Sequence, residues 1–257
     1  GRFPGRPGAA AEGAAALAEG SHAVVIDASA AHRTSPGWEY GLPELGCGRP
    51  ERIAASRRIA VPGCHASGFV ALVEPLVREG LIPKDTRLVC SSLTGYSGGG
   101  KKMIAQYSAA DGALAAPRQY GLGQRHKHLK EMVALTGLRT APAFCPVVAE
   151  FYSGMEVTVP LFAENLKAGA TAADVKEVYR ALYDGNIVFF REDCDEDGFM
   201  SASAYTGKDS MEISVWGNEE RILLVARYDN LGKGASGGAG ECMNLARGLP
   251  PETGLEL

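Results

Sequence analysis

Short apolar runs that fit buried strands alternate with helical segments through most of this chain. The runs are rich in β-branched residues and bounded by turn formers, and they cover residues 22–29, 86–95, 155–164, 186–192, 211–218 and 221–230. Apolar residues at helical spacing fill residues 67–80, and a threonine cap precedes a second predicted helix within residues 171–185. The last two runs are joined by a tight turn and predict a hairpin. This alternation predicts an α/β protein with a mixed sheet and helices packed on one face.

Composition narrows the class of protein further. Hydrophobic residues make up 46% of the chain and charged residues 22%, which are the values of a globular protein. The formal net charge of -4 gives no electrostatic attraction toward nucleic acid or an anionic membrane. No apolar run approaches the ~18 residues of a membrane helix. We therefore expect a cytoplasmic protein that binds a small molecule, with neither nucleic acid nor membrane as a partner.

The cysteines are scattered, with no C-x-x-C pair among them. This spacing fits neither a disulfide framework nor a zinc ribbon, and it favours free thiols in a reducing compartment. We expect no metal site. The six positions are Cys47, Cys64, Cys90, Cys145, Cys194 and Cys242.

Cys64 is the most informative of these thiols because it follows Pro62-Gly63 and precedes an apolar helix. A sulfur at a helix N-terminus is stabilised as the reactive thiolate by the helix dipole and by unpaired amides. On this argument we expect the helix end to lower the pKa of Cys64. A buried, inert cysteine is an equally weighted interpretation of the position alone.

A thiolate nucleophile usually needs an acid/base partner, and the chain has five histidines. His126 and His128 lie two residues apart, so they point the same way in an extended or loop segment but not on a helix. The pair is interpreted either as a solvated surface patch or as the source of that partner. No third and fourth ligand follow at a spacing that suits a metal.

Glycine is unusually frequent, with 33 of 257 residues, and two glycine-lysine segments stand out. The first, residues 95–102, nearly spells a phosphate loop, but Lys102 stands where the magnesium-ligating Ser or Thr would be. A nucleoside triphosphatase is therefore excluded. The second, residues 229–238, places Lys233 among glycines before the last predicted helix. Either backbone could still approach a phosphate closely.

Taken together, these segments resemble a known family. VPGCHASGF, LTGYSGGGKKMIAQY, YGLGQRHKHLKEM and DNLGKGASGG occur in the order and spacing of the short-form N-acetyl-gamma-glutamyl-phosphate reductases, and the resemblance covers roughly residues 15–249. It implies an α/β fold: an incomplete Rossmann dinucleotide-binding domain plus a mixed-sheet α+β catalytic and dimerisation domain, semialdehyde-dehydrogenase-like. Residues 1–62 would form the first, with residues 230–257 packing back onto it, and residues 63–229 the second.

The resemblance also implies a site and a reaction. Cys64 falls on the nucleophile and His128 on the acid/base histidine. Residues implied to meet the substrate are Ser29, Arg33 and Glu131, and those implied to meet NADP(H) are Gly95, Ser97, Gly98, Asn230, Gly232 and Lys233. The implied reaction reduces N-acetyl-L-glutamyl 5-phosphate to N-acetyl-L-glutamate 5-semialdehyde, with release of phosphate, through a cysteine thioester in arginine biosynthesis.

The sequence departs from the family pattern in several places. Members typically read NPGCYPTGF and HVPEM where this chain has VPGCHASGF and HLKEM, and GGAGECMN replaces a segment that usually carries Val-Gln-Asn. The first ~70–80 residues of the family have no counterpart, and residues 1–8 do not match the glycine fingerprint for a dinucleotide. We expect either a longer natural protein or weak binding of NADPH.

Two alternatives remain open. One is the closely similar reductase of lysine biosynthesis, which acts on a longer substrate that pocket residues alone do not separate. The other is a truncated, non-catalytic remnant. In either case we expect a homo-oligomer, a dimer or tetramer, because residues 211–218 and 221–230 present a continuous apolar face that includes Trp216 and Leu223.

Overall fold

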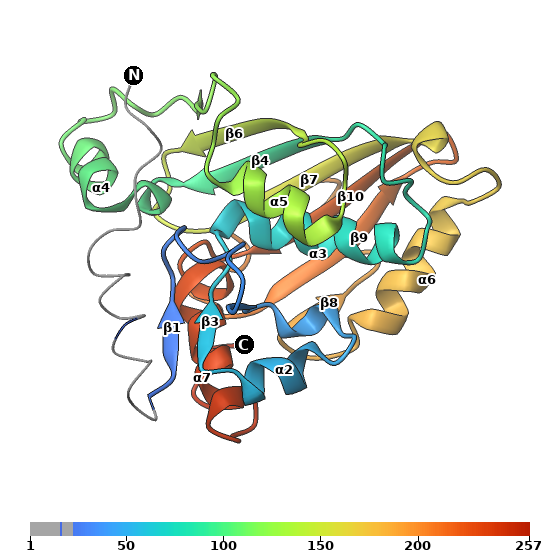
Figure 1. Ribbon diagram of the computed structural model, residues 1–257. Coiled ribbons are helices and arrows are strands. Elements are labelled where there is room, and N and C mark those ends of the chain that lie inside the picture. Colours follow the sequence, from blue (N-terminus) through green and yellow to red (C-terminus); the bar gives the residue numbers. More distant parts are fainter. Residues whose placement is uncertain (1–15, 17–22) are drawn as a thin grey trace.

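The computed structural model describes Ala16 and residues 23–257, and two sheets organise this part of the chain (Figure 1). The larger sheet has seven strands in the order β5-β6-β4-β7-β10-β9-β8. Their bounds are β4 Val89–Gly95, β5 Arg118–Gln119, β6 Ala143–Ala149, β7 Met155–Phe162, β8 Val188–Phe190, β9 Met211–Gly217 and β10 Arg221–Tyr228. Strand β4 pairs with β6, and β8 with β9, in parallel, whereas the other pairs are antiparallel. The mixed sheet is as predicted.

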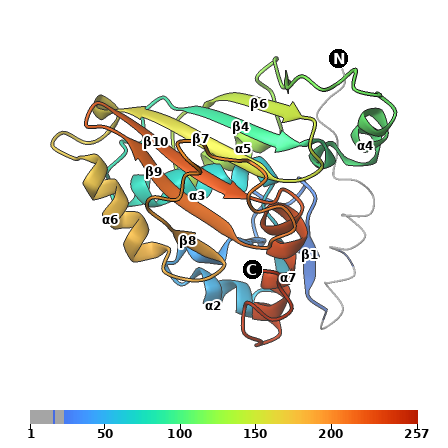
Figure 2. The ribbon, with the colours of Figure 1, turned by 180° about the vertical axis from the view of Figure 1, so that it is seen from behind.

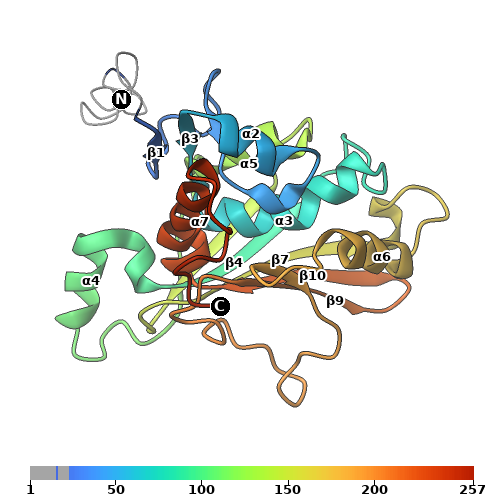
Figure 3. The same ribbon diagram turned by 90° about the horizontal axis from the view of Figure 1, so that it is seen from below.

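Three helices cover one face of this sheet: α3 (Cys64–Arg78), α5 (His128–Thr136) and α6 (Ala172–Leu182) (Figure 3). Helix α3 is buried along most of its length, and residues such as Phe69, Leu72 and Leu76 join the main hydrophobic core. An all-round apolar helix of this kind belongs at the centre of a domain. Helix α6 begins at the predicted cap, where the backbone N–H of Asp174 donates to Thr171 Oγ1.

The opposite face of the sheet is partly open. Strands β7, β10 and β9 lie side by side in the view from behind (Figure 2), and Leu223 stands opposite Pro160 on one side and Trp216 on the other. Leu223 is 42% exposed and Phe162 57%. The segment between β8 and β9 crosses this face nearby, where the Tyr205 hydroxyl donates to a carboxylate oxygen of Glu212.

A second, smaller sheet carries the N-terminal part of the described chain. Its strands β1 (Val25–Asp27), β3 (Arg58–Ala60) and β2 (Glu39–Tyr40) are parallel, in the order β1-β3-β2. Helices α2 (Arg49–Ala55) and α7 (Gly237–Ala246) pack against one another, and α7 also packs against β1. Cys242 of α7 joins Ile53 and Ile59 in a small separate core. The C-terminal segment thus returns to the N-terminal sheet.

Several elements differ in extent from the sequence expectation. Strands β1 and β8 are shorter than the apolar runs that contain them, and the glycine-rich segment after β4 forms a 3-10 turn (Tyr96–Gly99) followed by helix α4 (Gly100–Ser108). Residues 1–8, which were compared with a dinucleotide fingerprint, lie outside the described residues. Across the described part of the chain, no helix is both long enough and apolar enough to span a membrane.

Candidate active site

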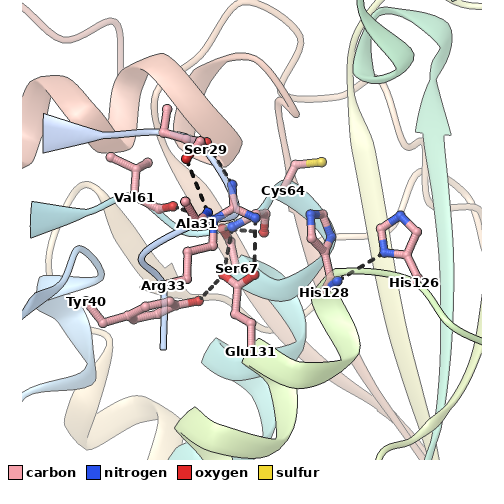
Figure 4. Close-up of polar contacts among 12 residues, drawn as sticks. Ser29, Ala31, Arg33, Tyr40, Val61, Cys64, Ser67, His126, His128 and Glu131 are labelled. Atoms are coloured by element: carbon pink, nitrogen blue, oxygen red, sulfur yellow. Dashed lines mark hydrogen bonds and ion pairs between the residues drawn. The ribbon is translucent and has the colours of Figure 1, made fainter. Parts of the chain in front are cut away.

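Cys64 is the first residue of α3, directly after the turn that leaves β3 (Figure 4). Gly63 is the N-cap, with extended backbone, so the predicted placement of the sulfur at a helix N-terminus is confirmed. The expected effect on its acidity is wrong. Burial raises the pKa of Cys64, and the opposing hydrogen bond from the His65 amide and the charge of Arg33 do not offset it. Cys64 is therefore a neutral thiol in the ligand-free site.

A cleft of about 400 Å³ opens beside Cys64, and several separate segments of the chain line it. This volume lies within the range of small-molecule sites. Its lining includes Arg33, Gly63 and Cys64, then Gly95, Ser97 and Gly98, then Tyr120, His126, Lys127 and His128, and finally Asn230 and Leu231. Residues far apart in the sequence thus meet at the start of α3.

His128 is the first residue of α5 and comes close to the turn before Cys64. A Cβ atom on Gly63 would lie 2.2 Å from His128 Nε2 and 2.4 Å from Arg33 Nη1, so only glycine admits both side chains here. Burial, helped by the neighbouring histidines and cations, lowers the pKa of His128 and keeps the ring neutral. Its Nδ1 atom is buried and finds no hydrogen-bond partner among the described residues.

Glu131, three residues further along α5, does not line the cleft. Its carboxylate accepts hydrogen bonds from the Gly63 amide (2.7 Å) and the Tyr40 hydroxyl (2.8 Å), and an ion pair to Arg33 (3.2 Å) completes its contacts (Figure 4). Arg33 also donates to the carbonyl oxygens of Ala28 and Val61, each at 2.9 Å. Glu131 therefore fixes Arg33 and the turn before Cys64, although it was implied to contact the substrate.

The expected cofactor loop lies on the other side of the cleft. The side chain of Asn230 donates to Ser97 Oγ at 3.0 Å and accepts from the Gly154 amide at 2.9 Å. A Cβ atom on Gly95 would lie 2.6 Å from the carbonyl oxygen of Tyr152, so this position requires glycine. A Cβ atom on Gly98 would make only ordinary contacts, with Asn230 Nδ2 at 3.4 Å and Thr94 Oγ1 at 3.5 Å.

This wall fits the nicotinamide end of a dinucleotide. Its surface includes the backbone of Gly95 and Gly98, where no side chain hinders the close approach of a ligand, and it adjoins Cys64 in the same cleft. The unpartnered Nδ1 of His128 is a second sign that the cleft is built for a polar ligand. Among the described residues, no group of three or more His, Cys, Asp or Glu side chains could hold a metal ion.

Besides Glu131, three implied site residues are not brought into the cleft. Ser29 is exposed, and its hydroxyl donates to Asp27 at 2.7 Å. Gly232 is buried against the carbonyl oxygen of Lys208. Lys233 is buried as well, and its ammonium group binds the carboxylates of Glu44 and Glu241.

Sequence reasoning also missed residues that the structure places at the site. Tyr120 and Lys127 line the cleft, and so does His65, the residue that follows Cys64 in the sequence. Tyr120 and Lys127 stand within the YGLGQRHKHLKEM motif, so the motif itself was the available signal. Nothing in the sequence marks Tyr40, whose hydroxyl reaches Glu131 from the segment before α2.

Comparisons with known proteins identify the fold and the family of this chain. Residues 64–230 match the family model "Semialdehyde dehydrogenase, dimerisation domain". Among solved structures, aspartate semialdehyde dehydrogenase II from Vibrio cholerae superposes with a TM-score of 0.71 at 18% identity, covering 93% of this chain and 76% of that one. The enzyme from Francisella tularensis gives a TM-score of 0.67 at 12% identity, covering 87% and 74% of the two chains. These likenesses establish the fold.

Sequence relatives are more specific. N-acetyl-gamma-glutamyl-phosphate reductase 2 of Nostoc sp. (strain PCC 7120) is 37% identical over 263 residues, which span 97% of this chain and 82% of that protein. The N-acetyl-gamma-glutamyl-phosphate reductase of Brucella ovis is 40% identical over 256 residues, or 94% and 81% of the two chains. The resemblance carried by the four motifs is thereby confirmed, and the chain belongs to the N-acetyl-gamma-glutamyl-phosphate reductase family of semialdehyde-dehydrogenase-type oxidoreductases.

Proposed function

We propose that this protein reduces N-acetyl-L-glutamyl 5-phosphate to N-acetyl-L-glutamate 5-semialdehyde in arginine biosynthesis, with release of phosphate. The observation that carries the proposal is the meeting of Cys64 and His128, the first residues of α3 and α5, in one cleft with Arg33. A thiol, a neutral imidazole and a guanidinium are the groups that acyl transfer from an acyl phosphate requires. Membership of the reductase family supports the same reaction.

The first half of the reaction uses only groups of this chain. The Cys64 sulfur attacks the acyl carbon while neutral His128 accepts the thiol proton. The nucleophile is thus activated by this proton transfer and needs no thiolate before the substrate binds. The S–C bond forms, the C–O bond to phosphate breaks, and the phosphate takes a proton from solvent. Arg33 lies in the cleft to hold an anionic group of the substrate.

The second half returns the enzyme to its starting state. When bound, a nicotinamide dinucleotide supplies the hydride that reduces the acyl carbon. His128 then donates its proton to the acyl oxygen, takes it back as the C–S bond breaks, and returns it to the sulfur, so that the aldehyde leaves and no net charge remains on the pair.

We propose NADP(H) as this dinucleotide, held at its nicotinamide end by Gly95, Ser97, Gly98 and Asn230. Gly232 and Lys233 act indirectly, because the ion pairs of Lys233 with Glu44 and Glu241 fix the loop that carries Asn230. The small parallel sheet and the returning α7 support a division into residues 1–62 with 230–257, for the dinucleotide, and residues 63–229, for catalysis. Ser29 is held by Asp27 and is not proposed to contact the substrate.

We further propose that the protein is a cytoplasmic homo-oligomer, a dimer or tetramer. The open face of β7, β9 and β10 exposes Phe162 and Leu223 next to Trp216. Apolar faces of this kind are normally covered by a second subunit. The matched family model describes a dimerisation domain, which supports the same face as the contact.

The test follows phosphate release and NADPH absorbance together, with N-acetyl-L-glutamyl 5-phosphate as substrate. We expect both, in equal amounts, from the wild type and neither from Cys64→Ser. Cys145→Ser, a thiol of β6 outside the cleft, is the matched control and should keep full activity. NADH in place of NADPH tests the cofactor, and the one-carbon-longer acyl phosphate tests the alternative substrate. A wild type that releases no phosphate would refute the proposal and favour the non-catalytic remnant.

A further inference from the structure

His65 directly follows the proposed nucleophile, and both nitrogens of its buried ring are engaged. Its Nδ1 lies 2.6 Å from Ser92 Oγ on β4, and its Nε2 lies 2.6 Å from the Tyr120 hydroxyl oxygen. His65 is 3% exposed and Ser92 1%. Tyr120 follows β5, and its ring and that of His65 both line the cleft. The imidazole thus connects the buried side of the sheet with the cleft.

The partners of Ser92 fix the direction of these hydrogen bonds. Among the described residues, His65 Nδ1 is the sole hydrogen-bond partner of Ser92 Oγ. A buried hydroxyl hydrogen without an acceptor is costly, so the Ser92 hydroxyl donates to Nδ1. The single proton of the neutral ring then resides on Nε2, which donates to the Tyr120 oxygen. The hydrogen of the Tyr120 hydroxyl is left to point into the cleft.

We propose that His65 is a positioning residue that makes Tyr120 a hydrogen-bond donor to an anionic oxygen of the bound acyl phosphate. The inference rests on the proposed function, which supplies that anion. Arg33 and Lys127 line the same cleft and bring positive charge to it. A hydroxyl donor in the same cleft as two cations suits a phosphate or carboxylate group, and hydrogen bonds to such charged groups are the strong ones.

The charge states of both groups suit this role. Burial, with His126 and Lys127 nearby, lowers the pKa of His65 to about 3, so the ring keeps one proton across the physiological range. Burial raises the pKa of Tyr120, so its hydroxyl stays protonated. The rings of His126 and His128 also pack against His65, and neither brings an acidic group to it.

Kinetics separates positioning from a merely structural role. His65→Phe keeps an aromatic ring but removes both hydrogen bonds, and Tyr120→Phe removes the donor itself. For each we expect the KM for the acyl phosphate to rise about tenfold, with kcat and the KM for NADPH changed less than about threefold. The double variant should be no worse than either single one. His65→Gln, which can still donate an N–H, should recover most of the loss.

Tyr205→Phe is the matched control, because it removes a tyrosine hydroxyl that hydrogen-bonds Glu212 outside the cleft. It should leave the KM for the acyl phosphate unchanged. Independent losses that add in the double variant would overturn the proposal. An unchanged KM in His65→Phe, or an equal rise in the KM for NADPH, would also overturn it.

A second measurement does not depend on turnover. Nitrogen NMR of 15N-histidine protein, with the His65→Phe spectrum for assignment, reports which ring nitrogen carries the proton. We expect a single neutral form protonated at Nε2 that does not titrate between about pH 5 and pH 9. Protonation at Nδ1 would overturn the donor chain even in an active enzyme. A wild type without turnover would refute the proposed function, and the tautomer would still decide this inference.

Discussion

Gly63→Ala adds one methyl group at the point where the site is tightest. The backbone of Gly63 has φ -76° and ψ 140°, which any residue adopts, so the substitution brings no backbone strain. Its Cβ would lie 2.2 Å from His128 Nε2 and 2.4 Å from Arg33 Nη1, whereas ordinary contacts begin near 3.4 Å. The imidazole and the guanidinium must therefore each retreat by about 1 Å, the misplacement that costs a reaction about a hundredfold in rate.

We expect kcat/KM to fall about a hundredfold, while overpacking destabilises the fold by only about 1–3 kcal/mol. The assay is steady-state reduction of the acyl phosphate, with guanidinium unfolding measured on the same preparation. Gly185→Ala is the matched control, because its Cβ would meet no atom closer than 3.8 Å. Activity above a third of wild type in Gly63→Ala, with an intact fold, would refute the steric argument.

Three further outcomes are expected. Because burial raises the pKa of Cys64, iodoacetamide should label the exposed Cys47 first at pH 7. The labelling rate of Cys64 should go on rising into the alkaline range. Peptide mapping that finds Cys64 labelled first at pH 7 would contradict this. Burial lowers the pKa of His65 to about 3 and that of His126 to about 4 in the folded state, whereas both lie near 6.5 in the unfolded chain. The unfolded chain therefore binds more protons, and the free energy of unfolding should fall as the pH drops from about 7 to 4. A free energy of unfolding, measured with urea, that stays constant over this pH range would contradict the expectation. Leu223→Glu should convert the oligomer to a monomer in light scattering at micromolar concentration, and a monomeric wild type would remove the basis for this expectation.

The sequence predicted what depends on neighbours along the chain. Cys64 at the start of α3 follows from a Pro-Gly turn before an apolar helix, and the β9–β10 hairpin follows from two strand patterns around a short turn. These are local signals. The mixed sheet followed from the same alternation of strand and helix.

Contacts between distant segments were not predictable in this way. Glu131 meets Tyr40 across 91 residues, and His65 meets Tyr120 across 55, and no pattern in either segment encodes the other. The glycine-rich sequence around Lys233 predicted a ligand-binding lysine. Its ammonium group is instead bound by the carboxylate of Glu44, which lies 189 residues away in the sequence. The prediction of a lowered pKa for Cys64 failed for a related reason, because the desolvation of a side chain depends on how the whole fold packs around it.

The two reacting side chains also share a mechanical dependence on the hydrophobic core. Helices α3 and α5 pack against each other, and each carries its functional residue at its first position, so their sliding or rotation changes the separation of sulfur and imidazole. Leu72 and Met132, both fully buried, lie on these helices one or two turns below the site. Substitutions at these two positions would therefore change the distance between the sulfur and the imidazole. The turnover number would change with this distance even where the global fold is kept.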